Sequence, residues 1–405
     1  MSAAARTPHL RRSNLALVLD QLRRRGASSR SELVAATGLT RSAIAGLVAE
    51  LATIGLVVET APAPDGRPGR PSPVVRVDDR SVVALAIEIF VDEIGAAFVA
   101  LDGSIVAAER LARPRARVAA AETIADVAEL VERLDAQLSD ASSPTVPRRL
   151  VGCGVSVPGL VRAQDGVVVA APNLGWIDVP LADSIASALD VRVPVTVGND
   201  ADLGALAESR LGAGVGSDHM IFVSGEVGVG GGLVAAGRPV VGHLGFAGEI
   251  GHLPVNADGR RCPCGSIGCW ETEVGEAALL ERAGLDPDGG RAAVDELLRR
   301  AGAGERLASQ ALAAEARWLA IGIAGLVNVL DPDTVVLGGL FSRVLPALRT
   351  QLDEELAARR YVAARREVAV VGATLGAVAV TVGAAEIAFG ALLDDPAGVM
   401  RAAVA

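Results

Sequence analysis

The sequence predicts an α/β protein with a small helical head, and three observations support this prediction. The chain of 405 residues is long enough for about three domains of the usual ~150 residues. Apolar residues make up 51% of it and charged residues 21%, which excludes a disordered or collagen-like chain. After Pro73, short strands rich in Val, Ala and Ile alternate with helices, a pattern typical of two α/β lobes.

Three short helices are predicted before the first lobe. Apolar spacing and glycine stops indicate helices over residues 13–25, 31–38 and 40–54, followed by the strand LVVET. The candidate N-caps are Ser29 or Ser31 and Thr40 or Ser42. In a helix–turn–helix DNA reader, the start of the second helix of the motif reaches base edges in the major groove. The residues expected to do so here are Thr40, Arg41, Ser42 and Ala45. An ordinary three-helix bundle is the alternative.

Charge is distributed unevenly along the chain. The net charge is −10, yet residues 1–76 contain 11 arginines and 5 acidic residues, a net +6. We therefore expect only the N-terminal part to face a polyanion such as double-stranded DNA. The segment GRPGRP, from Gly66 to Pro71, resembles arginine hooks that enter A·T-rich minor grooves, which makes Arg67 and Arg70 candidate DNA contacts. A stiff proline linker is the alternative for this segment.

Four potential metal ligands gather in the second half of the chain: His252, Cys262, Cys264 and Cys269. One imidazole and three thiolates form a closed tetrahedral set typical of structural zinc, so we expect Zn²⁺ to hold a loop rather than to do chemistry. Three cysteines crowded without a metal are the alternative. The chain has no secretory signal and no run of eighteen uncharged apolar residues, which favours reduced cysteines, a cytoplasmic protein and no membrane span.

Four domains follow from these patterns. They are a winged helix–turn–helix at 1–61, a Pro/Gly/Arg wing and linker at 62–80, a first α/β lobe at 81–198, and a second lobe at 199–405 with the zinc loop and the C-terminal helices. The first lobe begins with a predicted three-stranded meander that turns at Asp102-Gly103.

Residues 225–275 resemble the signature of the ROK family of bacterial sugar kinases and sugar-responsive repressors. The resemblance rests on GEIGH, on the following Cys-x-Cys-Gly-x-x-Gly-Cys and on the glutamate after it, and it extends over nearly the whole chain. The helix–turn–helix head makes the chain similar to the repressor branch, which includes the xylose and N-acetylglucosamine repressors. The resemblance implies a two-lobed, actin-like (ribonuclease H-like) ATPase fold with a sugar bound in the cleft.

The resemblance also implies which residues contact the sugar, through the segments SVPGLV, APNLGW, VGNDADLGALAE and GEIGH. These residues are Gly159, Asn173, Asn199, Asp200, Glu249, His252 and Glu271. Their carboxylates and carboxamides suit sugar hydroxyls, because each hydroxyl both donates and accepts hydrogen bonds. Asp200 matches the kinase base, and Asp202 replaces a usual asparagine. His252 is implied twice, with one ring nitrogen on zinc and the other on the sugar.

Two nucleotide-binding segments depart from the pattern of the family's kinases. In place of Asp-x-Gly-Gly-Thr the chain has Glu88 to Asp92, where Phe90 and Val91 would fill the space for phosphate. Glu226-Val227-Gly228 stands in place of Gly-Thr-Gly, whereas Gly338-Gly339 still resembles the turn on the adenosine side. We therefore expect no kinase activity, with Asp200 as a vestigial base.

The function expected from the sequence is a DNA-binding regulator, a repressor of carbohydrate metabolism genes that senses a sugar in a degenerate kinase cleft. Its expected partners are double-stranded operator DNA and a small sugar effector. Because helix–turn–helix heads read half-sites in pairs, a homodimer or a dimer of dimers is expected. An ATP-dependent sugar kinase is the alternative. A regulator controlled by a protein partner is a third reading, which the retained hydroxyl-binding set disfavours.

Overall fold

The computed structural model describes six stretches of the chain: residues 3–60, 73–114, 117–140, 148–225, 228–359 and 368–402. Its contacts divide it into two compact units. The first unit comprises Met1–Asn199 together with Thr381–Ala405, and the second unit comprises Asp200–Val380.

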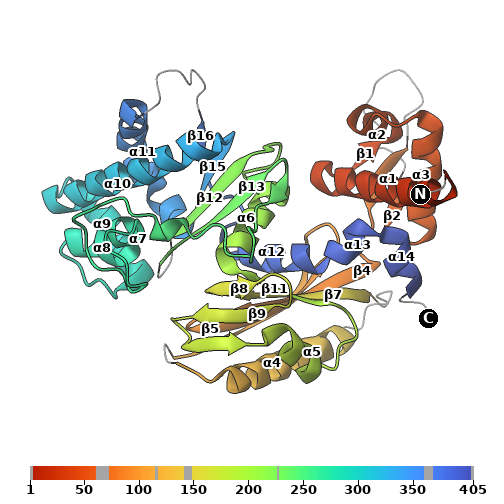
Figure 1. The fold of residues 1–405 in the computed structure, drawn as a ribbon, viewed down its shortest axis with the longest axis horizontal. Coiled ribbons are helices and arrows are strands. Elements are labelled where there is room, and N and C mark those ends of the chain that lie inside the picture. Colours follow the sequence, from red (N-terminus) through yellow and green to blue (C-terminus); the bar gives the residue numbers. More distant parts are fainter. Residues whose placement is uncertain are drawn as a thin grey trace. The chain divides into compact units, whose positions relative to one another are not determined.

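Three helices form the start of the head, which we define as residues 3–77 (Figure 1). They are α1 (Ala3–Arg25), α2 (Arg30–Thr37) and α3 (Arg41–Thr53). Ser29 caps α2 through a capping box with Glu32, and Gly38 ends it at φ +70°. Helices α2 and α3 meet at 113°, an angle usual for a helix–turn–helix. Helix α1 begins ten residues before the predicted start at Ser13, since the alanines and arginines there favour helix.

A small antiparallel sheet completes the head. Its strands are β1 (Ser28–Ser29), β2 (Val57–Thr60) and β3 (Val74–Val77), in the order β1-β3-β2. Strand β3 lies within the stretch predicted as wing and linker, but it pairs with β2 and buries Val75 and Val77. Residues 74–77 therefore belong to the head's sheet. Arg67 and Arg70 lie outside the described residues.

The rest of the first unit, which we call the first lobe, is built on a five-stranded sheet. Its order is β11 (Val195–Asn199), β7 (Arg149–Val157), β4 (Val82–Ile89), β5 (Glu93–Ala100) and β6 (Ile105–Ala112). Strand β4 is parallel to β7 and antiparallel to β5, so the predicted meander is confirmed. A three-stranded sheet follows, with β8 (Leu160–Arg162), β9 (Val167–Ala171) and β10 (Trp176–Val179).

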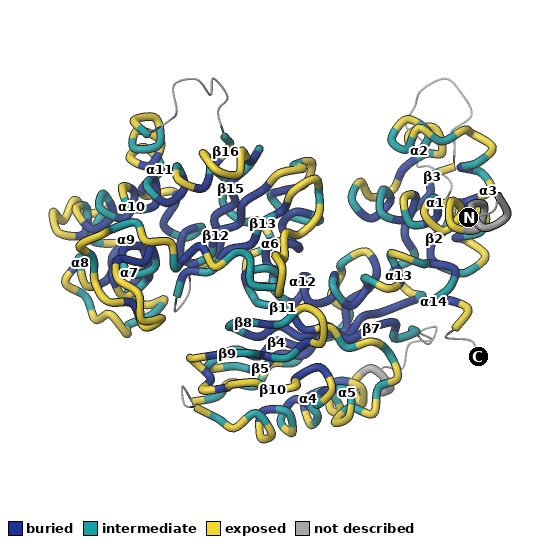
Figure 2. Tube along the Cα trace, in the orientation of Figure 1, coloured by how far each residue is buried: buried dark blue, intermediate teal, exposed yellow. Residues whose placement is uncertain are grey.

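Helices cover both faces of the five-stranded sheet, and every residue of β4 is buried (Figure 2). Helices α4 (Ala120–Asp140) and α5 (Leu181–Ala188) pack on one face. Helix α12 (Ala379–Ala388) lies on the other, directly against β7, because a Cβ at Gly152 or Gly154 would lie 2.1 or 1.8 Å from the backbone oxygens of Ala388 and Ala384.

The C-terminal helices therefore belong to the first unit, and their predicted place in the second lobe is wrong. Besides most of α12, they are α13 (Gly390–Asp394) and α14 (Pro396–Ala402). The order of elements along the chain does not determine which sheet a late helix covers. Their apolar faces are buried on the first lobe and on α1.

The second unit is built on another five-stranded sheet. Its order is β14 (Arg238–Pro239), β13 (Val229–Ala235), β12 (Met220–Gly225), β15 (Thr334–Gly338) and β16 (Ala369–Gly372). Helix α6 (Asp200–Leu211) covers one face near β12 and β13, and α11 (Gly339–Arg359) covers the other. The remaining elements are η1 (Ile250–His252), α7 (Glu271–Val274), α8 (Glu276–Arg282), α9 (Gly290–Gly302), α10 (Arg306–Leu330) and η2 (Gly376–Val378).

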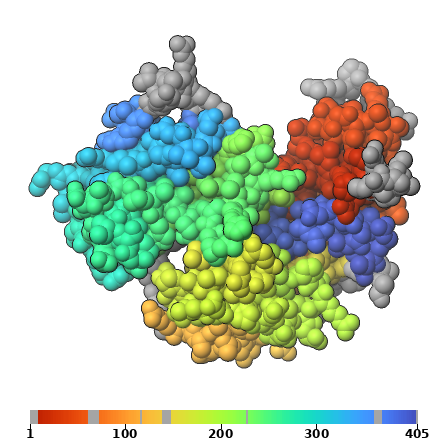
Figure 3. Space-filling view, viewed as in Figure 1, coloured from red at the N-terminus to blue at the C-terminus, as the bar shows by residue number. Residues whose placement is uncertain are grey.

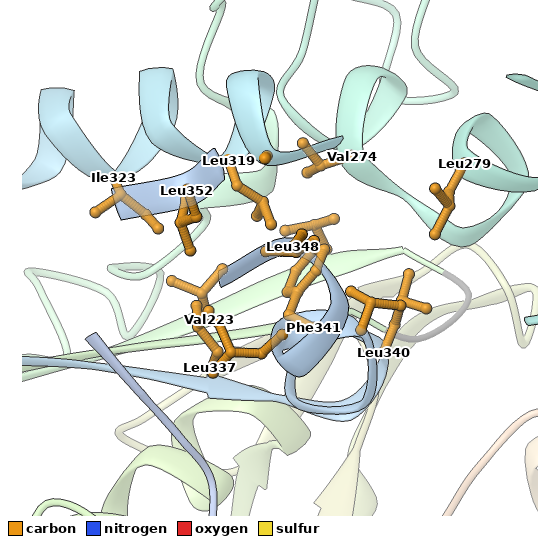
Figure 4. Packing of buried hydrophobic residues seen from close by; sticks show 14 of the residues in the cluster. Val223, Val274, Leu279, Leu319, Ile323, Leu337, Leu340, Phe341, Leu348 and Leu352 are labelled. Atoms are coloured by element: carbon orange, nitrogen blue, oxygen red, sulfur yellow. The ribbon is translucent and has the colours of Figure 1, made fainter. Parts of the chain in front are cut away.

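The largest apolar core of the second unit lies between its sheet and α10 (Figure 4). Phe341 and Leu348 of α11 meet Leu319 and Ile323 of α10 there. Helix α10 is long and apolar enough to cross a membrane by length and composition. Its contacts with α8, α9 and α11 identify it instead as a core helix.

Candidate functional site

The start of α3 presents the polar side chains that the sequence predicts for DNA reading. Thr40 is the N-cap of α3, and its Oγ1 accepts a hydrogen bond from the backbone N–H of Ala43 at 3.3 Å. Arg41 and Ser42 are exposed in the first turn, while Ala45 is partly buried. Ile44 and Leu47, on the other face of the helix, are buried. The first turn of α3 therefore offers a polar, solvent-facing end.

The four predicted metal ligands lie together in the second unit. Their ligand atoms all lie within 4.8 Å of one another. Cys264 Sγ is 3.7 Å from Cys269 Sγ, and Cys262 Sγ is 3.7 Å from His252 Nδ1. Zinc–sulfur bonds of ~2.3 Å in a tetrahedron separate two sulfurs by about 3.8 Å, so the donor set fits zinc.

Tight turns bring these ligands together. Gly265 and Gly268 adopt φ values of +96° and +71°, which side chains with a Cβ rarely adopt. Cys262 donates its backbone N–H to Ser266 at 2.9 Å, and Pro254 forms a bridge with Cys269. The glycines of the Cys-x-Cys-Gly-x-x-Gly-Cys pattern thus fold the loop.

The protonation of the thiols depends on the same loop. Burial, followed by donation of the thiol to Glu271, raises the pKa of Cys262. A hydrogen bond from the backbone of Ser266 lowers the pKa of Cys264. A cation bound here must displace the proton of Cys262, because the thiolate is the ligand.

His252 lies between the ligand cluster and a carboxylate. Its Nδ1 faces Cys262, and its Nε2 is 3.7 Å from Glu249 Oε2. Glu271 Oε1 accepts from Cys262 Sγ at 2.8 Å and lies 3.5 Å from Nδ1 of His252. The two ring nitrogens thus have different surroundings, with Cys262 and Glu271 near Nδ1 and Glu249 near Nε2.

Three carboxylates, Asp200, Asp202 and Glu249, form what we call the acidic group. Burial, together with the charge of Glu249, raises the pKa of Asp200 to about 6. Burial and the charges of Glu249 and Asp200 raise the pKa of Asp202 to about 7. Burial also raises the pKa of Glu249. Partial burial limits the hydration of these like charges. The group therefore favours a ligand whose hydroxyls donate hydrogen bonds to the carboxylates.

The other predicted sugar contacts lie in the first unit. Gly159 has φ +113°, and a Cβ there would lie 2.3 Å from the backbone oxygen of Ala170. Asn199 donates from Nδ2 to the carbonyl of Gly159 at 3.0 Å. Asn173 is exposed in the turn between β9 and β10. The structure therefore joins Asn199 to Gly159 and leaves Asn173 in its own loop.

The segment that aligns with the kinase phosphate loop, Glu88 to Asp92, is held by contacts with other residues of the first unit. Glu88 accepts from Arg110 Nη2 at 2.7 Å and from Thr381 Oγ1 at 2.8 Å. Phe90 donates its N–H to the carbonyl of Glu93 at 2.8 Å, and Val91 packs on the core of the first lobe. The sequence reasoning missed Arg110 and Thr381, since nothing local to either residue indicates the contact.

The second departure from the kinase pattern falls partly outside the described residues. Glu226 and Val227 are not described. A Cβ at Gly228 would lie 3.0 Å from Glu271 Oε2. Gly338 ends β15, and Gly339 begins α11 with φ +53°. A tight strand-to-helix turn is therefore present at the predicted adenosine side.

Comparison with known sequences finds both repressors and kinases. The chain is 27% identical to the xylose repressor of Bacillus subtilis (strain 168) over 386 residues, which are 95% of this chain and 97% of the repressor. It is 30% identical to the glucokinase of Streptomyces coelicolor over 329 residues, which are 76% of this chain and 97% of the kinase.

The solved structures that resemble this chain also include a regulator and kinases, and they confirm the α/β fold. A ROK family transcriptional regulator described as a homologue of the E. coli MLC protein has a TM-score of 0.79 at 23% identity, over 98% of this chain and 99% of the regulator. A ROK family glucokinase from Streptomyces griseus, in complex with glucose and AMPPNP, has a TM-score of 0.63 at 29% identity, over 76% and 99%. The ROK family model matches residues 84–390, more than half of the sequence, so the chain belongs to the ROK family.

Proposed function

We propose that the chain is a sugar-responsive transcriptional repressor that acts on carbohydrate metabolism genes. One observation carries this proposal: the head, residues 3–77, precedes the ROK match, which begins at residue 84. The xylose repressor aligns with 95% of the chain, whereas the Streptomyces coelicolor glucokinase aligns with 76% although nearly all of its own length is used. The extra part of this chain is thus the part with a helix–turn–helix angle.

The proposed DNA interface is the head, acting as a winged helix–turn–helix. The exposed first turn of α3 supports a role in base reading for Thr40, Arg41 and Ser42, with Ala45 one turn further on. Arg67 and Arg70 remain candidate minor-groove contacts. Because such heads read half-sites in pairs, the working form is proposed to be a homodimer or a dimer of dimers, in the cytoplasm where the DNA is.

A gel-shift series tests the DNA contacts, on an operator selected from random duplexes with the purified chain. Base contacts contribute about 1–3 kcal/mol each, so Arg41→Ala should relax sequence preference. Arg67→Ala with Arg70→Ala should weaken binding to all sequences and flatten its salt dependence. Unchanged affinity and specificity in both variants would reject these assignments.

The proposed sugar contacts in the second unit are Asp200 and Glu249 of the acidic group, with His252 and Glu271 beside the thiols. Burial and the charge of Glu249 raise the pKa of Asp200, and burial raises the pKa of Glu249. Sugar hydroxyls that donate to these carboxylates would stabilise the charged forms, which supports this role. Gly159, Asn173 and Asn199 of the first unit are proposed contacts on the resemblance. An analogue that lacks one of the paired hydroxyls should bind more weakly, because it leaves a polar group of the site unpaired.

A structural zinc is proposed at His252, Cys262, Cys264 and Cys269. With four protein ligands the ion would have no open position, so it would supply folding energy to the loop. Through Nδ1 it would also fix the ring of His252, whose Nε2 faces Glu249.

A sugar kinase is the second candidate, favoured by the pKa of about 6 at Asp200, which suits a general base near neutral pH. Two features oppose a kinase. Phe90 and Val91 stand where the kinase pattern has glycines that admit phosphate, and Glu88 is already paired with Arg110. A coupled assay with ATP, Mg²⁺ and a panel of sugars should read background. Turnover near the ordinary enzyme rate of ~10 s⁻¹ would establish the kinase instead.

A sugar panel in thermal-shift and gel-shift assays tests the sensor. One sugar should raise the unfolding temperature and change operator affinity, because it can shift an equilibrium only by binding two states differently. Asp200→Ala and Glu249→Ala should keep operator binding and lose the response. Glu296→Ala, which removes a half-buried carboxylate of α9 that pairs with Arg299 and Arg300, is the matched control and should respond like the parent. If the Asp200 and Glu249 variants also respond, a protein partner becomes the better explanation of control.

A further inference from the structure

Arg23 is a charged residue of α1 that lies buried in the first lobe. Three arginines end α1, and they differ in their surroundings. Arg25 is exposed, and Arg24 pairs with Asp20 on the same helix. These two suit the negative end of the helix dipole and need no further role. The side chain of Arg23 is only 3% exposed.

The guanidinium of Arg23 is held from three elements of the lobe. Its Nε donates to the carbonyl of Leu101 at 2.7 Å, beyond the end of β5. Nη1 donates to Oε2 of Glu386 in α12 at 3.0 Å, and Nη2 donates to Oε1 of the same carboxylate. The guanidinium carbon also lies 5.3 Å from the ring centre of Phe389. The arrangement is a two-pronged ion pair with a cation–π contact.

Burial of both charges indicates a role in orientation more than in stability. Desolvation of two charges costs several kcal/mol, so a buried pair adds little net stability over well-packed apolar side chains. The planar guanidinium of Arg23, however, fixes the direction of the Glu386 carboxylate in a way that apolar contacts do not. Helix α1 also contacts α13 and α14, and the N-terminal surface meets the C-terminal helices in Figure 3. The pair thus stands inside the contact between head and lobe.

Helix α12 carries this pair at one end and a second anchor at the other. Thr381 donates to Glu88, which is held by Arg110. Thr381 and Glu386 are five residues apart, about 7.5 Å along a helix. The helix lies against the backbone of β7, as the close approach at Gly152 and Gly154 requires. Glu386 is therefore presented by a helix that has little freedom to slide.

We infer that Arg23 and Glu386 are positioning residues that fix the orientation of the DNA-reading head on the first lobe, with α12 connecting this joint to Glu88. The inference rests on the proposed DNA binding. Two heads read successive major grooves only at a set separation, about 34 Å for half-sites one turn apart. A head held by a directional joint should therefore bind paired half-sites only at the correct spacing. In a chain whose joint is loosened, each head should still bind its own half-site.

The experiment uses the full chain and an operator selected from random duplexes by the parent. The test variant is Arg23→Met with Glu386→Leu, which replaces the pair by apolar side chains so that no charge is left buried alone. Arg133→Met with Glu109→Leu, an ion pair on the surface of the first lobe, is the matched control. A second test variant, Glu386→Gln, keeps the shape of the side chain and removes its charge.

Three affinities are measured for each protein: for one half-site, for two at the native spacing, and for two with five base pairs inserted, half a helical turn. The parent and the control should prefer the native spacing. The test variants should keep half-site affinity, while their preference for the native spacing should fall about tenfold. A change of this size is usual for coupling between sites. A loss of unfolding temperature alone is what a purely structural role predicts.

Two results would overturn the inference. A folded test variant with the parent's spacing preference would show that the pair does not orient the head. Reduced half-site affinity with an unchanged preference would place Arg23 within the fold of the head itself. Failure of the parent to select any duplex is a different result, because it rejects the proposed function and, with it, the basis of the inference.

Discussion

Each unit contains a carboxylate whose pKa is raised by burial, Glu88 in the first and Asp202 in the second, and the groups around the two differ. In the first unit, burial raises the pKa of Glu88, and the hydroxyl of Thr381 and the guanidinium of Arg110 offset part of this rise. In the second unit, burial raises the pKa of Asp202, and the charges of Glu249 and Asp200 raise it further. A buried charge is costly unless it is paired. Nearby donors partly compensate the charge of Glu88, whereas like charges surround Asp202 beside the proposed sugar contacts.

The largest expected effect is on the second unit, through loss of the proposed zinc. Chelation of protein purified with zinc should lower the unfolding temperature by about 10 °C or more, since closed thiolate sites contribute folding energy directly. Differential scanning fluorimetry with and without chelator measures this change. Cys262→Ser should behave like chelated protein.

Cys153→Ala is the control for the metal prediction. Cys153 is buried in β7 of the first unit, where burial raises its pKa to about 12. It should therefore stay a thiol and its removal should leave the zinc content unchanged. Elemental analysis that finds no stoichiometric zinc in the parent would reject the assignment.

The next effect is a gain of stability from Asp202→Asn. The pKa of Asp202 is about 7 in the fold against 3.8 as the ordinary value. Its contribution to stability is therefore complete below pH ~4 and is lost as the pH rises through about 7. Asparagine cannot ionise, so the variant should be more stable at pH 8 by about 2–4 kcal/mol.

Urea unfolding between pH 4 and pH 8 measures this difference. The parent should lose stability across the range, and the variant should lose less. Equal slopes in the two proteins would mean that Asp202 is not a strained carboxylate, and the contrast with Glu88 would disappear.

The smallest effect is expected for Glu88→Gln. The amide oxygen can still accept from Thr381, and Arg110 is 40% exposed, so water replaces much of the lost ion pair. The free energy of unfolding should fall by about 1 kcal/mol. The sugar response should remain, in contrast to Glu249→Ala. Loss of the response in this variant would make Glu88 part of the ligand site.

The residues that were predictable from sequence are those with a local signature. Ser29 with Glu32 and Thr40 mark helix starts through side-chain capping, and the spacing of the cysteines marks the ligand set. These elements depend on neighbours a few residues away. The structure therefore matches the sequence at the starts of α2 and α3 and in the clustering of the four potential metal ligands, whereas α1 begins ten residues before its predicted start.

The joint of the head could not be predicted in the same way. Arg23 and Glu386 are separated by 363 positions, and Glu88 and Thr381 by 293. An arginine at a helix end and a glutamate in an alanine-rich helix are ordinary residues there. The one local signal was Gly-x-Gly inside the buried strand β7, which indicates a close backbone approach but not which element approaches.

The glycine contact between β7 and α12 also has a genetic consequence. A larger residue at Gly152 or Gly154 would push α12 off the sheet. Because α12 carries Glu386, such an allele should misplace the head, with its proposed DNA contacts, although neither position is near α3 in the sequence. In a colony screen for loss of repression, these two codons should appear as hits beside those of the head, and their products should still bind sugar.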